Sequence, residues 1–297
     1  MISAVQLAAP RLLAGMLMAL AGALGYTTMD TLVKLLTARL PSVQILCLVY
    51  LVGMLPILVW CTATGTLSAV RSRRPVVQLV RGVAMLAASL LFFHALSRLP
   101  LADAYALLFT MPLVVTALSV PLLGEPVGWR RLAAVAVGFV GVLVMLRPGS
   151  GIVEPAALGV LVCAVCAGLS NVLIRRVGGV ESAESFVVWG SLIASLGTLP
   201  LALAAWVTPT GDEVLLLLVA GLLGGLSGLA VTTAYRVAPA ALVAPFQYMQ
   251  MPGGLLTGWL LFGDWPEPLV LAGAAIIIGS GLYILHREAR LDRAARR

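Results

Sequence analysis

Residues 95–125 read ALSRLPLADAYALLFTMPLVVTALSVPLLGE, and residues 234–264 read AYRVAPAALVAPFQYMQMPGGLLTGWLLFGD. Both stretches contain a prolyl turn, an apolar run interrupted by prolines, and a turn made of glycine and an acidic residue. Pro100 and Pro239 are 139 residues apart, and so are Gly124 and Gly263. A single offset shared by several features indicates an internal duplication, so we expect two copies of one structural unit.

The composition excludes a water-soluble globular domain. The 297 residues are 61% hydrophobic and 10% charged, whereas soluble domains average about 25% charged residues. The surface is therefore expected to face lipid. The net charge of +7 comes from basic groups at the ends of apolar runs and in the C-terminal tail, so the sequence predicts a lipid-bilayer partner and no nucleic-acid partner.

Ten runs of the chain are long enough to cross a membrane, which takes about 20 mostly apolar residues. The first run continues past Gly25 to Met29, which favours a retained helix over a cleaved signal peptide. Short polar, prolyl or glycyl breaks separate the runs. The expected spans are 12–34, 43–63, 76–97, 101–122, 129–147, 155–176, 184–206, 213–235, 240–262 and 267–286.

The basic residues orient these spans. With both termini in the cytoplasm, 15 of the 19 Lys and Arg residues lie on the cytoplasmic side. The four on the other side are Lys34, Arg39, Arg98 and Arg147. By the positive-inside rule, the sequence predicts a multi-pass protein of the bacterial inner membrane with both termini cytoplasmic.

The duplication divides the ten spans into five and five. We expect a first unit at residues 1–150, a second at 151–286, and a basic cytoplasmic tail at 287–297. Because five is odd, the second unit crosses the membrane in the opposite direction to the first. Inverted repeats are typical of secondary transporters, which bind substrate near the midplane between the repeats. The expected fold is therefore an all-α integral membrane protein around a central cavity.

Each unit carries its own set of short motifs. They are Arg81, Phe92 to His94, Pro100-Leu-Ala, Pro112, Gly124-Glu125, Gly138 to Gly141 and Arg147-Pro-Gly in the first unit, and Ala238-Pro239, Gly263-Asp264 and Gly279-Ser-Gly in the second. These motifs resemble two EamA repeats, so the chain is similar to the drug/metabolite transporter superfamily and, within it, to the YddG-type amino-acid exporters. This resemblance implies a basket of helices whose cavity is lined mainly by the first, third, fourth, sixth, eighth and ninth spans.

Two details qualify the resemblance. Asp264 stands where the first repeat has Glu125. The run from Asp30 to Lys34, together with Arg81, also resembles carriers for S-adenosylmethionine. The resemblance therefore leaves the direction of transport open.

Prolines interrupt both copies of the duplicated stretch. Each one removes a backbone hydrogen bond and kinks or breaks a helix. We expect hinges at Pro112, Pro245 and Pro252, with a static bend as the alternative.

The ninth span carries the most suggestive polar cluster. Gln247 and Gln250 are three residues apart and share a helix face, and Tyr105 and Phe109 of the fourth span are expected to lie opposite them by repeat symmetry. Amide and aromatic groups suit a zwitterionic or planar substrate, and the alternative role is hydrogen bonding between helices. The candidate cavity residues are Ser89, His94, Tyr105, Phe109, Asn171, Phe246, Gln247, Tyr248 and Gln250.

Three ionisable residues are candidates for coupling, because charged groups inside spans are rare and usually functional. Asp30 precedes Lys34 by one helical turn, which predicts a local ion pair at the membrane rim. A role for Asp30 in proton coupling or amine binding is the alternative. His94 is either a proton-sensitive switch or a hydrogen-bonded structural residue.

Several chemistries have no motif in the chain. There is no phosphate-binding GxxxxGK[ST] loop and no HExxH, so we expect no cofactor, no metal and no enzymatic activity. The sequence predicts a secondary transporter that moves small organic metabolites by alternating access, with a monomer sufficient. Export of aromatic and neutral amino acids is the first expectation. The alternatives are an uptake carrier for a cationic or nucleoside-like metabolite such as S-adenosylmethionine, and a membrane scaffold without transport.

Overall fold

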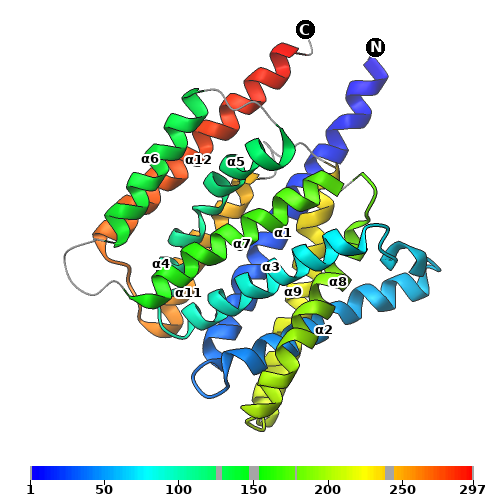
Figure 1. Cartoon of the computed structure of the whole chain (residues 1–297), viewed down its shortest axis with the longest axis vertical. Helices are drawn as coiled ribbons and strands as arrows, with labels where there is room; N and C mark the ends of the chain where they lie inside the picture. Colours follow the sequence, from blue (N-terminus) through cyan, green and yellow to red (C-terminus); the bar gives the residue numbers. More distant parts are fainter. Residues whose placement is uncertain (1, 125–128, 147–153, 178, 238–243, 296–297) are drawn as a thin grey trace.

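The computed structural model describes residues 2–124, 129–146, 154–177, 179–237 and 244–295. Within these ranges the regular structure is helical throughout (Figure 1). The helices are α1 (Ile2–Leu36), α2 (Ser42–Ala63), η1 (Leu67–Val70), α3 (Pro75–Leu96), α4 (Leu101–Leu108), α5 (Met111–Leu123), α6 (Trp129–Leu146), α7 (Pro155–Val177), α8 (Ala183–Ala204), α9 (Gly211–Val237), η2 (Ala244–Met249), α11 (Gln250–Thr257), η3 (Gly258–Phe262) and α12 (Pro268–Ala295).

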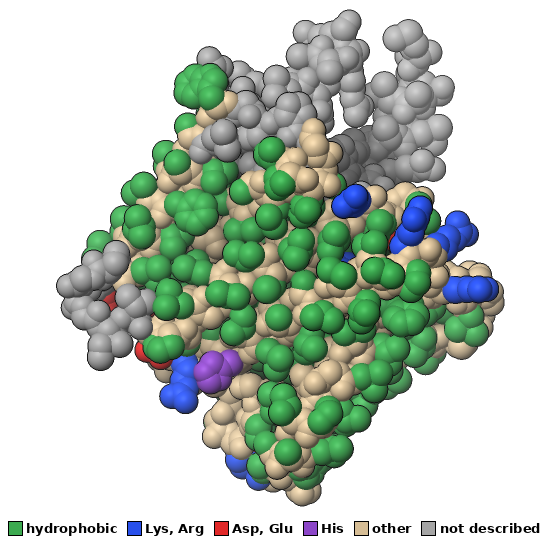
Figure 2. Space-filling model, in the orientation of Figure 1, with side chains coloured by type: hydrophobic (Ala, Val, Ile, Leu, Met, Phe, Trp, Pro, Cys, Tyr) green, Lys and Arg blue, Asp and Glu red, His purple; other side chains and the backbone are tan. Residues whose placement is uncertain are grey.

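The described helices suit a bilayer in length and composition. Seven segments are long and apolar enough to cross a membrane: Leu13–Leu36, Ser42–Ala63, Pro75–Leu96, Leu101–Leu123, Pro155–Ile174, Ala183–Ala204 and Gly211–Ala234. Two shorter apolar helices, Ala133–Leu146 and Pro268–Tyr283, coincide with the expected fifth and tenth spans. Figure 2 shows hydrophobic side chains over most of the visible face, with Lys and Arg mainly toward its edges. The protein is therefore a multi-pass membrane protein.

The fourth expected span is broken where the sequence predicted a break. Helix α4 ends at Leu108 and α5 begins at Met111. Pro112 is the second residue of α5, a position at which its missing N–H leaves no intrahelical bond unmade. Pro121 lies inside α5 without ending it. The break at Pro112 is thus confirmed, whereas its use as a moving hinge stays a prediction.

The ninth expected span is broken, as its two internal prolines predicted. Residues 240–243 lie outside the described ranges, and the rest forms a 3₁₀ helix (η2), a two-turn α-helix (α11) and a π-helix (η3). Pro245 and Pro252 each remove a backbone donor, which explains why regular α-helix is lost here. Gly263 then takes a left-handed φ of 69°, and Gly124 after α5 takes 68°. Only glycine adopts this conformation without strain, so the two copies end in the same kind of turn.

The helices pack in pairs that are distant in sequence. Helix α1 lies against α9, α3 against α7, and α2 against both α8 and α9. Helices α6 and α12 form a separate pair at one edge of the molecule (Figure 1). Helix α1 begins and α12 ends at the same end of the molecule. Helices α1, α3, α4, α7 and α11 contact one another in the middle of the bundle.

Two of these pairs approach closely through glycine. A Cβ added to Gly225 of α9 would lie 1.9 Å from the carbonyl oxygen of Gly53 on α2, and one added to Gly273 of α12 would lie 2.6 Å from the carbonyl oxygen of Gly141 on α6. Small residues spaced by four allow backbones this close in lipid. The face of α9 that carries Gly221 and Gly225 is therefore a packing surface against α2.

At one end of the bundle, Glu181 joins the loop before α8 to the start of α3. Its carboxylate is buried and accepts hydrogen bonds from the backbone N–H groups of Arg73 (2.8 Å) and Arg74 (2.7 Å). The hydroxyls of Ser72 and Ser185 add bonds of 3.0 Å each. The carboxylate thereby caps the N-terminus of α3, where the helix dipole favours a negative charge.

Glu181 gives this junction a defined pH dependence. Burial raises the pKa of its carboxyl, but the hydrogen bonds from Ser72, Arg74, Ser185 and Arg73 outweigh burial and hold the pKa below its ordinary value of 4.5. Because the folded pKa lies below the unfolded one, the contribution of Glu181 to stability is complete above about pH 5, begins to fall near pH 4.5 and is lost as the pH falls through the lower folded pKa.

We expect Glu181→Gln to destabilise the protein by about 1–3 kcal/mol at pH 7, because hydrogen bonds to a charged acceptor are lost. The melting temperature in detergent, followed from pH 7 to pH 4, checks this. The deficit of the variant should shrink as the pH falls. Glu184→Gln, one turn into α8, is the matched control and should melt like the wild type. A deficit that stays constant across this range would contradict the assigned role of the carboxylate.

The opposite end has a comparable junction between α2 and the loop before α9. The Gln44 side chain donates to the carbonyl of Val207 at 2.7 Å and accepts from its N–H at 2.9 Å. Arg39 forms a salt bridge with Glu213 and also donates to the carbonyl of Thr208. One end of the bundle thus ties α3 to the loop before α8, and the other ties α2 to the loop before α9.

Candidate functional site

Asp30 of α1 is the ionisable group at the centre of the described helices. Its side chain is only 4% exposed. The hydroxyl of Tyr105 on α4 donates to its Oδ2 atom at 2.8 Å, while its Oδ1 atom is buried and has no hydrogen-bond partner among the described residues. A buried carboxylate that is only half satisfied is costly, and such groups mark functional sites more often than structural ones.

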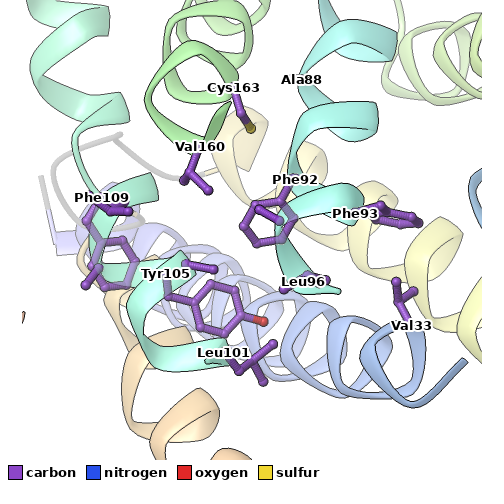
Figure 3. Close-up of a cluster of buried hydrophobic side chains, with 14 of the residues drawn as sticks. Val33, Ala88, Phe92, Phe93, Leu96, Leu101, Tyr105, Phe109, Val160 and Cys163 are labelled. Atoms are coloured by element: carbon purple, nitrogen blue, oxygen red, sulfur yellow. The ribbon is translucent and has the colours of Figure 1, made fainter. Parts of the chain in front are cut away.

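Close packing against glycine holds Tyr105 in place. The backbone of Gly254 on α11 lies under the ring, since a Cβ added there would be 2.6 Å from the ring atom Cδ2. On the other side, the ring of Phe92 on α3 lies with its centroid 6.1 Å from that of Tyr105. Figure 3 shows these two rings turned toward each other, with Val160 and Cys163 of α7 nearby. The site therefore draws on α1, α3, α4, α7 and α11.

The predicted meeting of the fourth and ninth spans takes place through aromatic rings. Phe109, at the break between α4 and α5, contacts Tyr248 of η2 edge to face, with ring centroids 5.1 Å apart. The Tyr248 hydroxyl points at Gly281 of α12, where an added Cβ would lie 2.1 Å from it. Tyr248 thus contributes its ring to the interior and directs its hydroxyl to the periphery.

Two tyrosines that the sequence analysis missed also face Asp30. Tyr26 lies one turn before Asp30 on α1, and Tyr50 comes from α2; both lie within electrostatic range of the carboxylate. The Tyr50 hydroxyl is 2.6 Å from that of Ser89, one of the predicted cavity residues. The spacing of Tyr26 and Asp30 by four residues was a usable signal for one shared face, whereas nothing local in the sequence identifies Tyr50.

The predicted ion pair between Asp30 and Lys34 is wrong. Lys34 forms its salt bridge with Asp264, at 2.9 Å, and donates a second bond of 2.9 Å to the carbonyl of Leu99. Its ammonium also lies 4.7 Å from the centre of the Phe262 ring. The π-helix η3 and the left-handed Gly263 turn bring Asp264 to this position, which spacing along α1 does not reveal. Asp264 is therefore more than the turn residue expected from its place in the repeat.

His94 does not lie in the interior. Its side chain is exposed at the last turn of α3, because that helix buries Ser89, Phe92, Phe93 and Leu96 on the opposite face. An exposed imidazole lines no cavity, so the prediction of His94 as a cavity residue is corrected.

The remaining predicted site residues lie in different parts of the bundle. Asn171 is half-buried on α7 and donates to the sulfur of Met111 at 3.4 Å. Phe246 packs beside Ala19 and Ala234, and Gln250 is half-buried at the start of α11. The side chain of Gln247 lies outside the described part of the structure, so the paired amide face stays a prediction.

Arg81 of α3 is a buried cation. Its guanidinium donates one hydrogen bond to the carbonyl of Phe186 on α8 and another, of 3.2 Å, to the side-chain oxygen of Gln78. It therefore joins the Glu181 junction rather than neutralising Asp30. Within the described residues no group of three His, Cys, Asp or Glu side chains could hold a metal ion.

A groove of about 430 Å³ lies between α6 and α12. It is lined by Trp129, Ala133, Ala134, Val137, Gly279, Ser280 and Tyr283. None of the predicted site residues borders it, and the groove lies in the peripheral helix pair, so it is separate from the Asp30 region.

A multi-pass helical bundle with a buried, partly satisfied carboxylate among aromatic rings is the arrangement of a membrane transporter. The chain matches the EamA-like transporter family twice, over residues 13–147 and 154–285. It therefore belongs to the EamA-like transporter family. The family and the relatives described next are transporters, and they indicate no catalytic activity.

Three curated relatives illustrate the range of this family. The chain is 35% identical over 228 residues to a riboflavin transporter of Rhizobium johnstonii, covering 76% of each chain. It is 26% identical to an S-adenosylmethionine uptake transporter of Rickettsia prowazekii, covering 87% of this chain and 88% of the relative. It is 29% identical to the pseudopaline exporter CntI of Pseudomonas aeruginosa, covering 89% and 93%.

A crystal structure of another protein shares the fold. It superposes with a TM-score of 0.68 at 21% sequence identity and covers 93% of this chain and 98% of that one. At this identity the similarity concerns the fold alone.

Proposed function

We propose that the protein is a secondary transporter that exchanges small metabolites containing a planar ring across the membrane. The observation that carries this proposal is the aromatic interior, in which Phe92, Tyr105 and Phe109 from the first half meet Tyr248 from the second. Flat rings stack on or edge-pack against such side chains with little conformational cost. The contact of Phe109 with Tyr248 lies where both spans are broken. Backbone at such a break can change conformation, which a continuous spanning helix cannot do.

The relatives support a heteroaromatic substrate. Riboflavin and S-adenosylmethionine, named for two of them, both contain a fused heteroaromatic ring system. A site with three rings and a carboxylate suits such a molecule better than it suits an aliphatic one. The relatives include both an uptake carrier and an exporter, so exchange is the transport mode proposed for this chain.

An amino-acid exporter is the second candidate. An aromatic amino acid carries a ring for the Phe92–Tyr105–Phe109 wall and an ammonium group for the Asp30 carboxylate. The exporter CntI, which matches 89% of this chain, favours this outward direction. Both candidates move a ring-containing compound, so the same transport assay compares them.

The proposed architecture has ten spans in two inverted halves, residues 1–150 and 151–286, in the bacterial inner membrane with both termini cytoplasmic. The packing supports it, because exchanging the first five spans with the last five maps the observed pairs onto one another. The contact of α1 with α9 exchanges with that of α7 with α3, and the contacts of α6 with α12 and α4 with α11 map onto themselves. Alternating access would then exchange the conformations of the broken segments α4–α5 and η2–η3.

Transport by purified protein in liposomes tests the proposal. Vesicles are preloaded with unlabelled riboflavin, S-adenosylmethionine or phenylalanine, and entry of the same labelled compound is followed. We expect accelerated counterflow for one of the ring compounds and none for labelled alanine. Protein-free vesicles and the Phe92→Leu variant are the controls, the latter keeping an apolar side chain but lacking a ring. Absence of exchange for every ring compound would refute the proposal, and exchange of phenylalanine alone would select the second candidate.

A further inference from the structure

The Asp30 carboxylate has no cationic partner in the described structure. The basic side chains of α1 and α3 in this region bind other groups. Lys34 forms its salt bridge with Asp264 and donates to the carbonyl of Leu99. Arg81 donates to the carbonyl of Phe186 and to the side chain of Gln78. Leaving an ionised carboxylate in a low-dielectric interior without a counter-charge costs several kcal/mol. The group must therefore be protonated, or be neutralised by a ligand.

The neighbouring hydroxyl groups of α1 already donate to backbone carbonyl groups. The hydroxyl of Thr27 donates to the carbonyl of Ala23 at 3.1 Å, and that of Thr31 donates to the carbonyl of Thr27 at 2.7 Å. Tyr105 supplies the single hydrogen bond that Asp30 receives, at Oδ2. The Oδ1 atom is thus an unmatched acceptor with 4% exposure of its side chain, inside a shell of aromatic rings.

The groups that face Asp30 from the surrounding helices add no positive charge at this point. They are Tyr26 on α1, Tyr50 on α2, Tyr105 on α4 and Cys163 on α7. Arg81 on α3 lies beyond Tyr50, with which it interacts. Helices α9 and α11 present Gly224, Ser227 and Gly228, and Gly253 and Thr257, on their sides toward α1.

We propose that Asp30 and Tyr105 form a single-cation subsite that a proton and the positively charged or N–H donor group of the substrate occupy in turn. This proposal rests on the proposed transport function and names its charged subsite. When the substrate enters, its cationic group approaches Oδ1 and the proton leaves to water; when the substrate departs, the proton returns. Tyr105 keeps its bond to Oδ2 in both states and so positions the carboxylate.

Because the proton and the substrate occupy the same site in turn, their movements across the membrane are linked. Each cycle that moves substrate one way moves a proton the other way, whereas exchange of substrate for substrate needs no proton. A pH gradient across the vesicle should therefore drive net movement of a ring-containing amine and leave counterflow at symmetrical pH running.

A hydrophobic carbodiimide tests the subsite directly, because this reagent couples to protonated carboxyl groups in apolar surroundings. We expect dicyclohexylcarbodiimide to label Asp30, identified by mass spectrometry, and the labelling rate to fall as the pH is raised. Tyramine, an aromatic amine without a carboxylate, is the probe ligand and should slow labelling at least threefold. Asp103→Asn is the matched control for carboxylates near α4 and should leave labelling of Asp30 unchanged.

The Asp30→Asn variant supplies the second readout. Asparagine keeps the shape and can accept from Tyr105, so the variant should retain the melting temperature of the wild type within a few degrees. It should lose the movement driven by a pH gradient while keeping substrate counterflow at symmetrical pH within reach of measurement. Carbodiimide labelling that tyramine does not slow, or an Asp30→Asn protein with unchanged pH-driven transport, would overturn the subsite.

These outcomes separate the subsite from the transport function. If the wild type exchanges no ring compound, the proposed function fails, while the labelling of Asp30 still reports on the subsite. If the wild type exchanges a ring compound and Asp30→Asn does so with the same pH dependence, the transport function stands and the subsite fails.

Discussion

Gly225→Ala should be the most damaging single-methyl change in the protein. The added Cβ would lie 1.9 Å from the carbonyl oxygen of Gly53 and 2.7 Å from its carbonyl carbon. Both obstacles are backbone atoms of α2, so no side-chain rotation relieves the overlap. Helices α2 and α9 must separate, which also strips Gly221 from its contact with Val52. Overpacking of this kind costs about 1–3 kcal/mol or more.

The measurement is the thermal unfolding midpoint of purified protein in detergent, together with the monodisperse fraction on size exclusion. Gly279→Ala is the matched control, because it adds the same methyl group to a helical glycine with nothing within 4 Å. That change should be neutral or stabilising by up to about 1 kcal/mol, as expected for alanine in a helix. Equal midpoints for the two variants would show that the α2–α9 approach is looser than the structure describes.

Features that depend on local chain chemistry were predictable from the sequence. The break at Pro112 and the glycine turns at Gly124 and Gly263 both follow from the residue type at one place. Proline lacks a donor and glycine lacks a Cβ, so each acts whatever the surroundings. The duplicated stretch that begins at Ala95 was readable for the same reason.

Contacts between distant segments were not predictable in this way. Lys34 lies one turn from Asp30 and 230 residues from Asp264, yet the π-helix and the Gly263 turn give the salt bridge to Asp264. The prolines of the ninth span predicted a break there, but nothing local predicted the π-helix η3 that follows it. His94 illustrates a third limit, since the buried face of α3 is fixed by its packing against α7 and α8.

The second large effect is expected at Lys34. This residue joins the end of α1 to the turn after η3 through Asp264 and to the turn before α4 through Leu99. Asp30 lies one helical turn deeper, so these contacts close the interior at this end of the bundle. The side chains of the pair are 12% and 33% exposed, which places its worth between the roughly 1 kcal/mol of surface pairs and the 3–5 kcal/mol lost when a buried pair is broken.

Lys34→Met should therefore open the interior to water and uncouple transport. Cys163 is a native reporter, being 3% exposed and within electrostatic range of Asp30. In a background with the other cysteines replaced by alanine, we expect a water-soluble maleimide to label Cys163 at least tenfold faster in Lys34→Met, since about 1.4 kcal/mol changes a population tenfold.

Two comparisons identify the cause of the faster labelling. Arg39→Met breaks a salt bridge at the same end of the bundle, to Glu213, but it lies outside the α1–α4–η3 contact and should leave the labelling of Cys163 unchanged. Exchanging the charges, with Lys34→Asp and Asp264→Lys together, should recover most of the slow labelling, because attraction between the two sites is restored. Fast labelling in the exchanged protein would assign the closure to the Leu99 and Phe262 contacts of Lys34, since these depend on lysine at position 34 and the salt bridge does not.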